Sequence, residues 1–178
     1  MPVKIIDNGT DNVIVLHPDH LELGEGTVTV NGSGSKVVIE RPYVCGRVEI
    51  TASDGATITI GPDCVISTVH VVARGGSVSI GARVNFNGPS VFRADEGRSV
   101  SVGDDCLFAE EVRVWTSDMH SIVDLKTRRR VNPARDVRIG NRVWVGDRAL
   151  VLKGASVGDG SIVGASAVLS GHVPENCI

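Results

Sequence analysis

An aliphatic residue stands at every sixth position from residue 139 almost to the end of the sequence. The series is Ile139, Val145, Val151, Val157, Val163 and Leu169. Glycine follows the aliphatic residue in four of these six hexads, and the fifth residue of each hexad is always small or β-branched. An α-helix does not repeat at six, and a lone amphipathic strand repeats at two. The period therefore predicts flat strands joined by sharp bends, with three strands forming one coil of about 18 residues.

The same period recurs upstream with wider spacing. Related segments begin at Ile60, Ile80 and Val102, which are 20 and 22 residues apart. These spacings indicate coils of about 18 residues that are enlarged at one corner. We therefore predict one all-β domain over 1–178, in which a parallel β-helix of triangular section at 27–178 follows a capping segment at 1–26.

Small residues are expected where the walls of this prism converge. Cys64, Cys106 and His70 fall in the small fifth position of the repeat, so they are interpreted as core filler. The glycines at the second position are expected at bends that demand a positive φ.

Composition fits a core of small β-branched side chains. Of 178 residues, 42% are hydrophobic but only 3% are aromatic, a mixture typical of many short strands. The net charge of −3 gives no basic field for nucleic acid, and no apolar run approaches the roughly 18 residues of a membrane span. The four cysteines are scattered without metal-ligand spacing, which favours reduced thiols in a cytoplasmic protein over a disulfide framework.

The repeat is interrupted once, in "VWTSDMHSIVDLKTRRRVNP". Val102 and Ile139 are 37 residues apart, which leaves a surplus of 19 residues after one coil of 18. We predict that residues 115–137 form a loop projecting from one corner. Long loops in compact domains are usually functional or disordered.

The hexads "IGNRVWVGDRALVLKGASVGDGSIVGASAVLSGHVPEN", together with this excursion, resemble those of the hexapeptide-repeat acyltransferases. The segment "VNPARDVRIG" is similar to the branch that O-acetylates sugars and capsular polysaccharides. The resemblance is strong over 100–178 and architectural before that. It implies a left-handed β-helix, a homotrimer with active sites between subunits, acetyl-CoA as donor without a metal, and a sugar or polysaccharide acceptor.

The resemblance also implies roles for particular residues. The family's catalytic histidine matches His120, and the tryptophan that lines its CoA tunnel matches Trp144. The glycine and alanine whose backbone meets the pantetheine arm match Gly164 and Ala165, although the motif reads VGASA here. An acceptor-binding asparagine matches Asn85 in "VNFN".

This sequence departs from the family pattern near its end. Members of the family continue past "VPEN" with a segment that completes the CoA pocket, whereas this sequence ends at Ile178. A lysine that follows the last hexads in the sugar branch is replaced by Gly171. We expect Lys153 or the arginines of the loop to supply the phosphate contact instead.

His120 is the only one of five histidines on the excursion. His17 and His20 are expected to face solvent, His70 to fill the core, and His172 to lie by the C-terminal turn. Acetyl transfer to a hydroxyl needs a base, and a histidine side chain is suited to that role near neutral pH. The absence of a GxSxG motif favours direct transfer over an acyl-enzyme.

Charged residues surround His120 in the sequence. Asp118 or Asp124 could orient the imidazole or contact substrate, and an ordinary turn is an equal alternative for either residue. The basic run 128–130, with Arg129 at its centre, could meet an acidic glycan or a CoA phosphate, although such runs are usually solvated.

The two tryptophans have different expected surroundings. Trp115 opens the loop and is interpreted as an anchor at the corner. Trp144 stands at a sixth position, so its indole is expected to point away from the prism, toward a subunit or a ligand.

Three other functions stay open. An N-acetyltransferase of an amino sugar nucleotide would use the same chemistry. A zinc carbonic anhydrase of the same fold would need three histidines, two of them about five residues apart, and this sequence has no such pair. A non-catalytic solenoid, such as an ice-binding sheet, is suggested by "TVTV" and "TITI" but leaves the loop unexplained.

Overall fold

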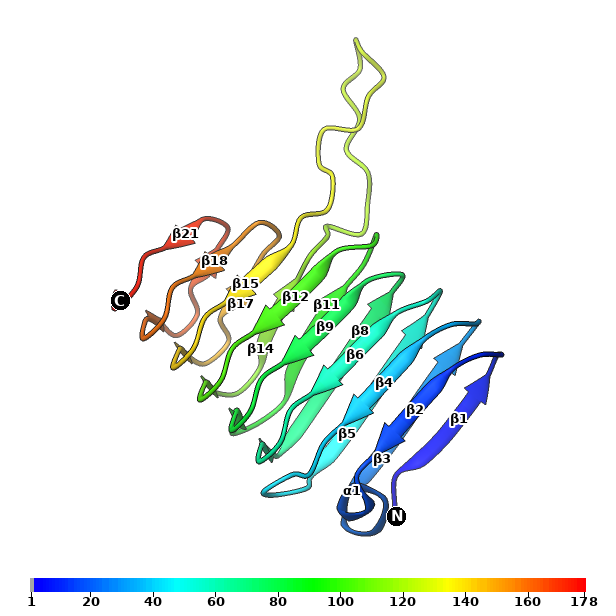
Figure 1. Cartoon of the computed structure of the whole chain (residues 1–178). Helices are drawn as coiled ribbons and strands as arrows, with labels where there is room; N and C mark the ends of the chain where they lie inside the picture. Colours follow the sequence, from blue (N-terminus) through cyan, green and yellow to red (C-terminus); the bar gives the residue numbers. More distant parts are fainter. Residues whose placement is uncertain (1) are drawn as a thin grey trace.

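The computed structural model describes residues 2–178, which form a triangular solenoid (Figure 1). Successive strands fall in turn onto three sheets, and all pairings between neighbouring strands are parallel. The two chain ends lie at opposite ends of the solenoid. The prediction of an all-β parallel β-helix is confirmed. No helix within 2–178 is long and apolar enough to cross a membrane.

Each sheet takes one strand from each coil that reaches it. The first sheet contains β1 (Lys4–Asn8), β3 (Glu25–Asn31), β5 (Arg47–Ser53), β8 (Thr68–Arg74), β11 (Ser90–Ala94), β14 (Val112–Trp115), β17 (Leu150–Val151) and β20 (Val168–Leu169). The second sheet contains β2 (Val13–Leu16), β4 (Lys36–Ile39), β6 (Thr57–Ile60), β9 (Ser77–Ile80), β12 (Ser99–Val102), β15 (Val137–Ile139), β18 (Ser156–Val157) and β21 (His172–Val173). The third sheet contains β7 (Val65–Ile66), β10 (Asn85–Phe86), β13 (Leu107–Phe108), β16 (Trp144–Val145) and β19 (Ile162–Val163).

The coils shorten toward the C-terminus. Leu150 pairs with Val168, a spacing of 18 residues, whereas Thr27 pairs with Glu49, a spacing of 22. The predicted coil of about 18 residues therefore holds only for the last coils. The early coils are longer because β3, β5 and β8 each have seven residues, while β17 and β20 have two.

The solenoid begins earlier than predicted. β1 already pairs with β3, and β2 pairs with β4, so the boundary at residue 26 is wrong. In this first coil the helix α1 (Pro18–Leu23) stands where the third sheet would continue. His20 lies on α1 and is only 1% exposed, contrary to the expectation that it faces solvent. The helix turns this side chain inward at the otherwise open end of the prism.

The glycines at the corners also have a different role from the one predicted. Gly103 does not have a positive φ; that conformation falls two residues later, on Asp105. A Cβ at Gly103 would lie 2.7–2.8 Å from the backbone carbonyl of Gly140 and 2.4 Å from Oδ1 of Asn141. Glycine is required here because the next coil approaches too closely for a side chain.

Alternation along each strand separates the core from the surface. In β8, Val69 and Val71 are buried, so His70 between them points outward, and the prediction that it fills the core is wrong. Cys64 and Cys106 are buried as predicted. Burial raises the pKa of the Cys64 thiol to about 11, so this thiol stays protonated. The four cysteines, all within 2–178, are free.

Candidate functional site

Residues 116–136 form an arm that projects from the corner between the first and second sheets (Figure 1). The arm leaves after β14 and rejoins at β15, within one residue of the predicted bounds at each end. An antiparallel bridge joins Val123 to Arg130. At the tip, the Asp124 carboxylate accepts hydrogen bonds from the backbone of Lys126 at 3.0 Å and of Thr127 at 2.6 Å. Asp124 is therefore a turn residue.

Asn132 fastens the two sides of the arm together at its base. Its Nδ2 donates to Oδ2 of Asp118 at 2.7 Å and to the backbone oxygen of His120 at 2.8 Å. Its Oδ1 accepts from the backbone nitrogen of Ile122 at 2.6 Å. Asn132 is 8% exposed, so these bonds are shielded from water. The backbone around His120 is held in one conformation as a result.

A second set of contacts ties the arm to the preceding coil. Arg130 donates to both carboxylate oxygens of Glu96, at 2.5 and 2.8 Å, and the hydroxyl of Ser117 donates to the same carboxylate at 2.6 Å. The hydrogen bonds from Arg130 and then Ser117 lower the pKa of Glu96 to about 2.

Lys153 ties the arm to the following coil. Its Nζ forms an ion pair with Oδ2 of Asp118 and lies 3.3 Å from the backbone oxygen of Asn132. The hydrogen bond from Lys153 is the first cause that lowers the pKa of Asp118, followed by the bond from Asn132. The structure thus brings two predicted ligand-binding residues, Asp118 and Lys153, into contact with each other at the arm's base.

His120 is exposed on the arm near this base. Within 2–178 its imidazole makes no hydrogen bond, to Asp118, Asp124 or any other residue. The ring is therefore free to meet a ligand. Among the other histidines, His172 lies beside the C-terminal turn, where its Nδ1 is 2.8 Å from the hydroxyl of Ser156.

Trp144 lies at the outer face of the third sheet and is 48% exposed, as expected for its place in the hexad. It lines an open groove of about 260 Å³ together with Gly164 and Ala165, the two other residues matched to the CoA side. Gly146 lies between them. A Cβ at Gly164 would meet nothing within 4 Å, so a side chain there would project into open space. Glycine keeps that space free for a narrow ligand.

Asn85 shares the outer face of the third sheet with Trp144. Asn85 pairs with Leu107, and Leu107 pairs with Trp144, so two strand spacings, roughly 10 Å, separate them. The Oδ1 atom of Asn85 is buried without a hydrogen-bond partner in the described chain. Buried polar atoms normally have a partner, so this atom is available to one from outside the chain.

The groove and His120 lie at different corners of the prism. The groove joins the third sheet to the turn that leads into the first sheet, at Gly146 and Gly164. The arm stands at the opposite edge of the first sheet, after β14. The width of a sheet face, on the order of 15 Å, separates them within one chain. One chain therefore does not bring His120 to its own groove.

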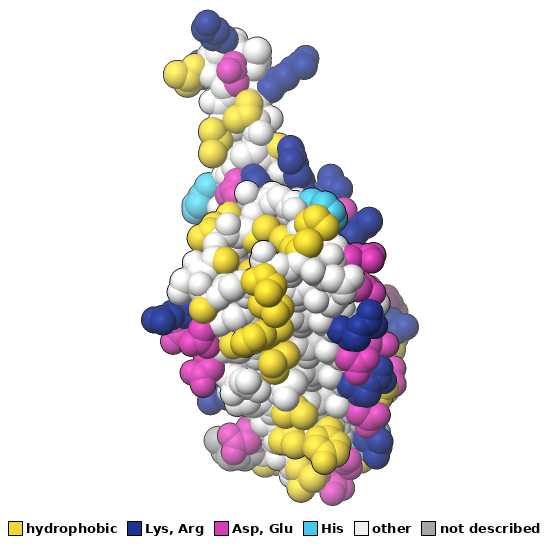
Figure 2. Space-filling view, turned by 90° about the vertical axis from the view of Figure 1, so that its left-hand side faces the viewer, with side chains coloured by type: hydrophobic (Ala, Val, Ile, Leu, Met, Phe, Trp, Pro, Cys, Tyr) yellow, Lys and Arg dark blue, Asp and Glu magenta, His cyan; other side chains and the backbone are white. Residues whose placement is uncertain are grey.

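Arg129 lies at the far end of the arm, where it is exposed and makes no ion pair in the described chain. Figure 2 shows basic side chains gathered at this end of the arm, and hydrophobic side chains in a stripe on the body below it. Trp115 is half-buried where the arm begins, as expected of an anchor.

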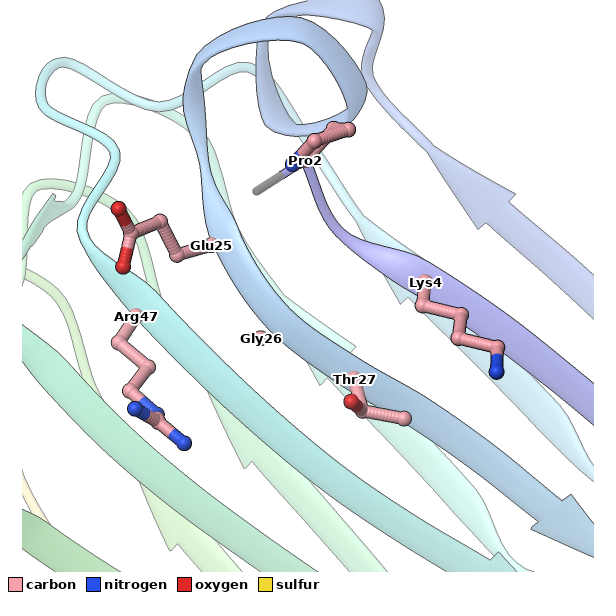
Figure 3. Close-up of a pocket in the computed structure, with 6 residues that line it drawn as sticks. All are labelled: Pro2, Lys4, Glu25, Gly26, Thr27 and Arg47. Atoms are coloured by element: carbon pink, nitrogen blue, oxygen red, sulfur yellow. The ribbon is translucent and has the colours of Figure 1, made fainter.

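A larger hollow of about 430 Å³ lies at the N-terminal end of the first sheet (Figure 3). Lys4, Thr27 and Arg47 surround Gly26 there, and the hollow exists because Gly26 has no side chain. A Cβ at Gly26 would lie 2.0 Å from the backbone oxygen of Val48. None of the residues matched to the family lines this hollow.

Sequence reasoning missed Asn132 and Glu96 as parts of the site. Asn132 precedes a proline in the segment "VNPARD", and a polar residue before a proline in a loop is a weak signal. Glu96 lies one coil away, and nothing in its local sequence indicates a contact with the arm.

Comparison with known proteins gives three consistent findings. The profile of the family described as bacterial transferase hexapeptide (six repeats) matches residues 136–171. The polysialic acid O-acetyltransferase of Neisseria meningitidis is 36% identical over 78 residues, covering 44% of this chain and 36% of that protein. The enzyme of the same name from Escherichia coli O1:K1 is 33% identical over 107 residues, covering 60% of this chain and 34% of that protein.

A solved structure is similar over nearly the whole chain. The crystal structure of the polySia-specific acetyltransferase NeuO superposes with a TM-score of 0.79 and 30% identity, covering 97% of this chain and 80% of that one. By contrast, the matches to the two curated relatives span only about a third of the length of those proteins.

Proposed function

This chain belongs to the hexapeptide-repeat acyltransferase superfamily, in its sugar O-acetyltransferase branch, and on that premise we propose that it transfers an acetyl group from acetyl-CoA to a hydroxyl of a sugar or polysaccharide. The single observation that carries the proposal is the groove. Trp144, Gly164 and Ala165 come from different hexads, yet they line one open space. A flat indole beside residues with small or no side chains suits the narrow pantetheine arm of CoA.

In the proposed mechanism His120 acts as the general base. Its imidazole takes the proton of the acceptor hydroxyl, and the oxygen attacks the carbonyl carbon of the thioester. The C–S bond then breaks, and the CoA thiolate takes the proton back from the imidazolium. Acetyl-CoA supplies the activated acyl group, so the chain needs no nucleophile of its own and no metal.

The active site is proposed to lie between subunits of a homotrimer. His120 and the groove of one chain lie at different corners, so the arm of one subunit would have to meet the groove of the next. The exposed Trp144 and the buried, unpartnered Oδ1 of Asn85 support a partner surface on the third sheet. Asn85 would bind the acceptor.

Two residues keep secondary roles in the proposal. Arg129 would contact an anionic part of a ligand from the arm's tip. Asp118 and Lys153 would hold the arm in place for catalysis, and a direct contact of either with a ligand would require their ion pair to open.

The test is acetyl transfer with the purified chain. Release of CoA thiol would be followed with acetyl-CoA and polysialic acid, neutral oligosaccharides and amino sugar nucleotides as acceptors. The expected product is an ester, which dilute alkali cleaves. An alkali-stable amide would assign the chain to amino sugars, and thiol release no faster than without acceptor would contradict the proposal.

A further inference from the structure

A second hollow lies at the base of the arm, on the side of the first sheet, and belongs to no part of the groove. It has a volume of about 270 Å³ and is lined by Arg74, Arg93, Asp95, Glu96 and Met119. Met119 directly precedes His120, so this hollow opens beside the proposed base.

The two arginines of this hollow are not fully engaged by the protein. Arg74 ends β8 and forms no hydrogen bond or ion pair through its side chain within residues 2–178. Arg93 bonds Asp95 through Nε alone, at 2.6 Å. Its two terminal nitrogens have no partner in the same described range. Planar guanidinium groups with free donors are suited to binding carboxylates.

The acidic residues of the hollow are engaged differently. Asp95 is 7% exposed and is held by Arg93, and Glu96 is held by Arg130 and Ser117. Each carboxylate thus has a cation beside it, while Arg74 has no acidic partner in the described chain. The excess positive charge of the hollow is located on Arg74. The bound carboxylates keep lone pairs that can accept from hydroxyl groups.

We infer that this hollow is the acceptor subsite and that it binds an acidic sugar, with Arg74 and the free edge of Arg93 holding the sugar's carboxylate. This inference rests on the proposed function, because it assigns the acceptor of the same reaction. A neutral sugar would leave Arg74 unpaired beside the bound ligand. The place next to Met119 puts a sugar hydroxyl within reach of His120.

The alternative source of negative charge is CoA, whose phosphates could also bind an arginine. The hollow lies on the side of the arm facing the preceding coils, with Arg74 two coils before the arm. The Trp144 groove lies on coils that follow the arm in the chain. This placement favours the acceptor over the donor.

The test compares one acceptor in two charge states. A sialic acid oligomer and a uronic acid oligomer would each be used intact and after reduction of their carboxylates to alcohols. We expect the wild-type chain to bind at least one intact oligomer about tenfold more tightly than its reduced form, as for a hydrogen-bonded charge pair. Binding would be measured by calorimetry without acetyl-CoA, and KM by thiol release.

Arg74→Gln is expected to raise the KM for the intact oligomer about tenfold. It should leave the KM for acetyl-CoA and for the reduced oligomer unchanged, and Arg74→Lys should restore part of the loss. Arg138→Gln is the matched control, because Arg138 is an exposed arginine on the second sheet, away from the hollow. It should behave as wild type with both forms.

Equal binding of the intact and reduced forms of both oligomers, or an Arg74→Gln variant indistinguishable from wild type, would overturn the inference. A rise in KM for acetyl-CoA alone would also overturn it, by assigning Arg74 to the donor. Failure of thiol release with every acceptor would instead defeat the proposed function, and the calorimetric comparison would still decide whether the hollow binds carboxylates.

Discussion

His120 combines an exposed imidazole with a fixed backbone, the arrangement that a general base on a projecting arm requires. The imidazole has no partner in the described chain, while Asn132 holds the His120 backbone oxygen at 2.8 Å. His120→Ala is expected to lower kcat by about 10²–10⁴-fold, the usual contribution of a positioned base. The KM for acetyl-CoA should change little, because His120 is far from the groove of its own chain.

The pH–rate profile provides the control for His120→Ala. The acidic limb of the profile reports protonation of the base, so it should disappear in the variant. The circular dichroism spectrum and melting temperature should stay those of wild type, because an exposed arm residue adds little to the stacking of coils. Wild-type turnover with an unchanged acidic limb would show that the base lies elsewhere.

The sequence predicts single residues well where a short pattern places them. The hexad position of Trp144 predicts an outward-facing indole, and the break in the repeat singles out His120. Asn132 and His20 are not predicted, for a common reason. The contacts of Asn132 join segments that approach only when the arm folds, and His20 is buried only because α1 turns it inward at the end of the solenoid. Neither condition is encoded in a local pattern.

Glu96 makes the arm's attachment resistant to acid. Its pKa of about 2 lies below the value of about 4.3 for an unfolded glutamate. A depressed pKa stabilises the folded form above the unfolded value, and this contribution is lost as the pH falls from about 4.3 through about 2. We expect the Glu96 carboxylate to remain ionised at pH 3.5, as measured by ¹³C NMR titration. Arg130→Gln should return the midpoint toward 4.3, and a wild-type midpoint already near 4.3 would contradict the ion pair.

At the scale of elements, the arm is held by a few side chains at its base. Asn132→Ala removes the bonds to Asp118, His120 and Ile122 together. We expect faster hydrogen exchange of arm amides and a kcat lowered about tenfold or more, because a misplaced base loses its geometry. The KM for acetyl-CoA should be unchanged.

Thr127→Ala is the control for the arm, because Thr127 lies at the tip and its hydroxyl bonds only Asp124 and the backbone of Arg129. It should loosen the tip without changing kcat. An Asn132→Ala variant with wild-type exchange and turnover would show that the network does not position His120.

The corners between sheets are predicted in position but not in physical cause. The hexad places a glycine at each corner, yet the reason is close approach between coils, a property of stacking that one hexad does not contain. Gly103→Ala should destabilise the chain by about 1–3 kcal/mol, because its Cβ would overlap the backbone of Gly140. Gly171→Ala should stay within about 0.5 kcal/mol, since nothing lies within 4 Å of its Cβ. Urea unfolding of both variants would measure this difference, and equal losses would refute it.

At the scale of the whole molecule, the two halves of the proposed site are carried on different corners of one prism. The arm stands between the first and second sheets, and the groove lies beside the third sheet. A closed ring of three subunits would let each arm meet the groove of its neighbour. Light scattering should therefore give three times the mass of one chain.

Mixing two inactive variants tests the shared site directly. His120→Ala removes the base and Trp144→Ala removes the wall of the groove, so each variant alone should have low activity at low acetyl-CoA. In mixed trimers, an intact arm from the Trp144→Ala chain can meet an intact groove from the His120→Ala chain. Random assembly of equal amounts restores about a quarter of the sites if each site joins two subunits. If the site lay within one chain, no mixture would regain activity, and the wild type could reach full turnover as a monomer.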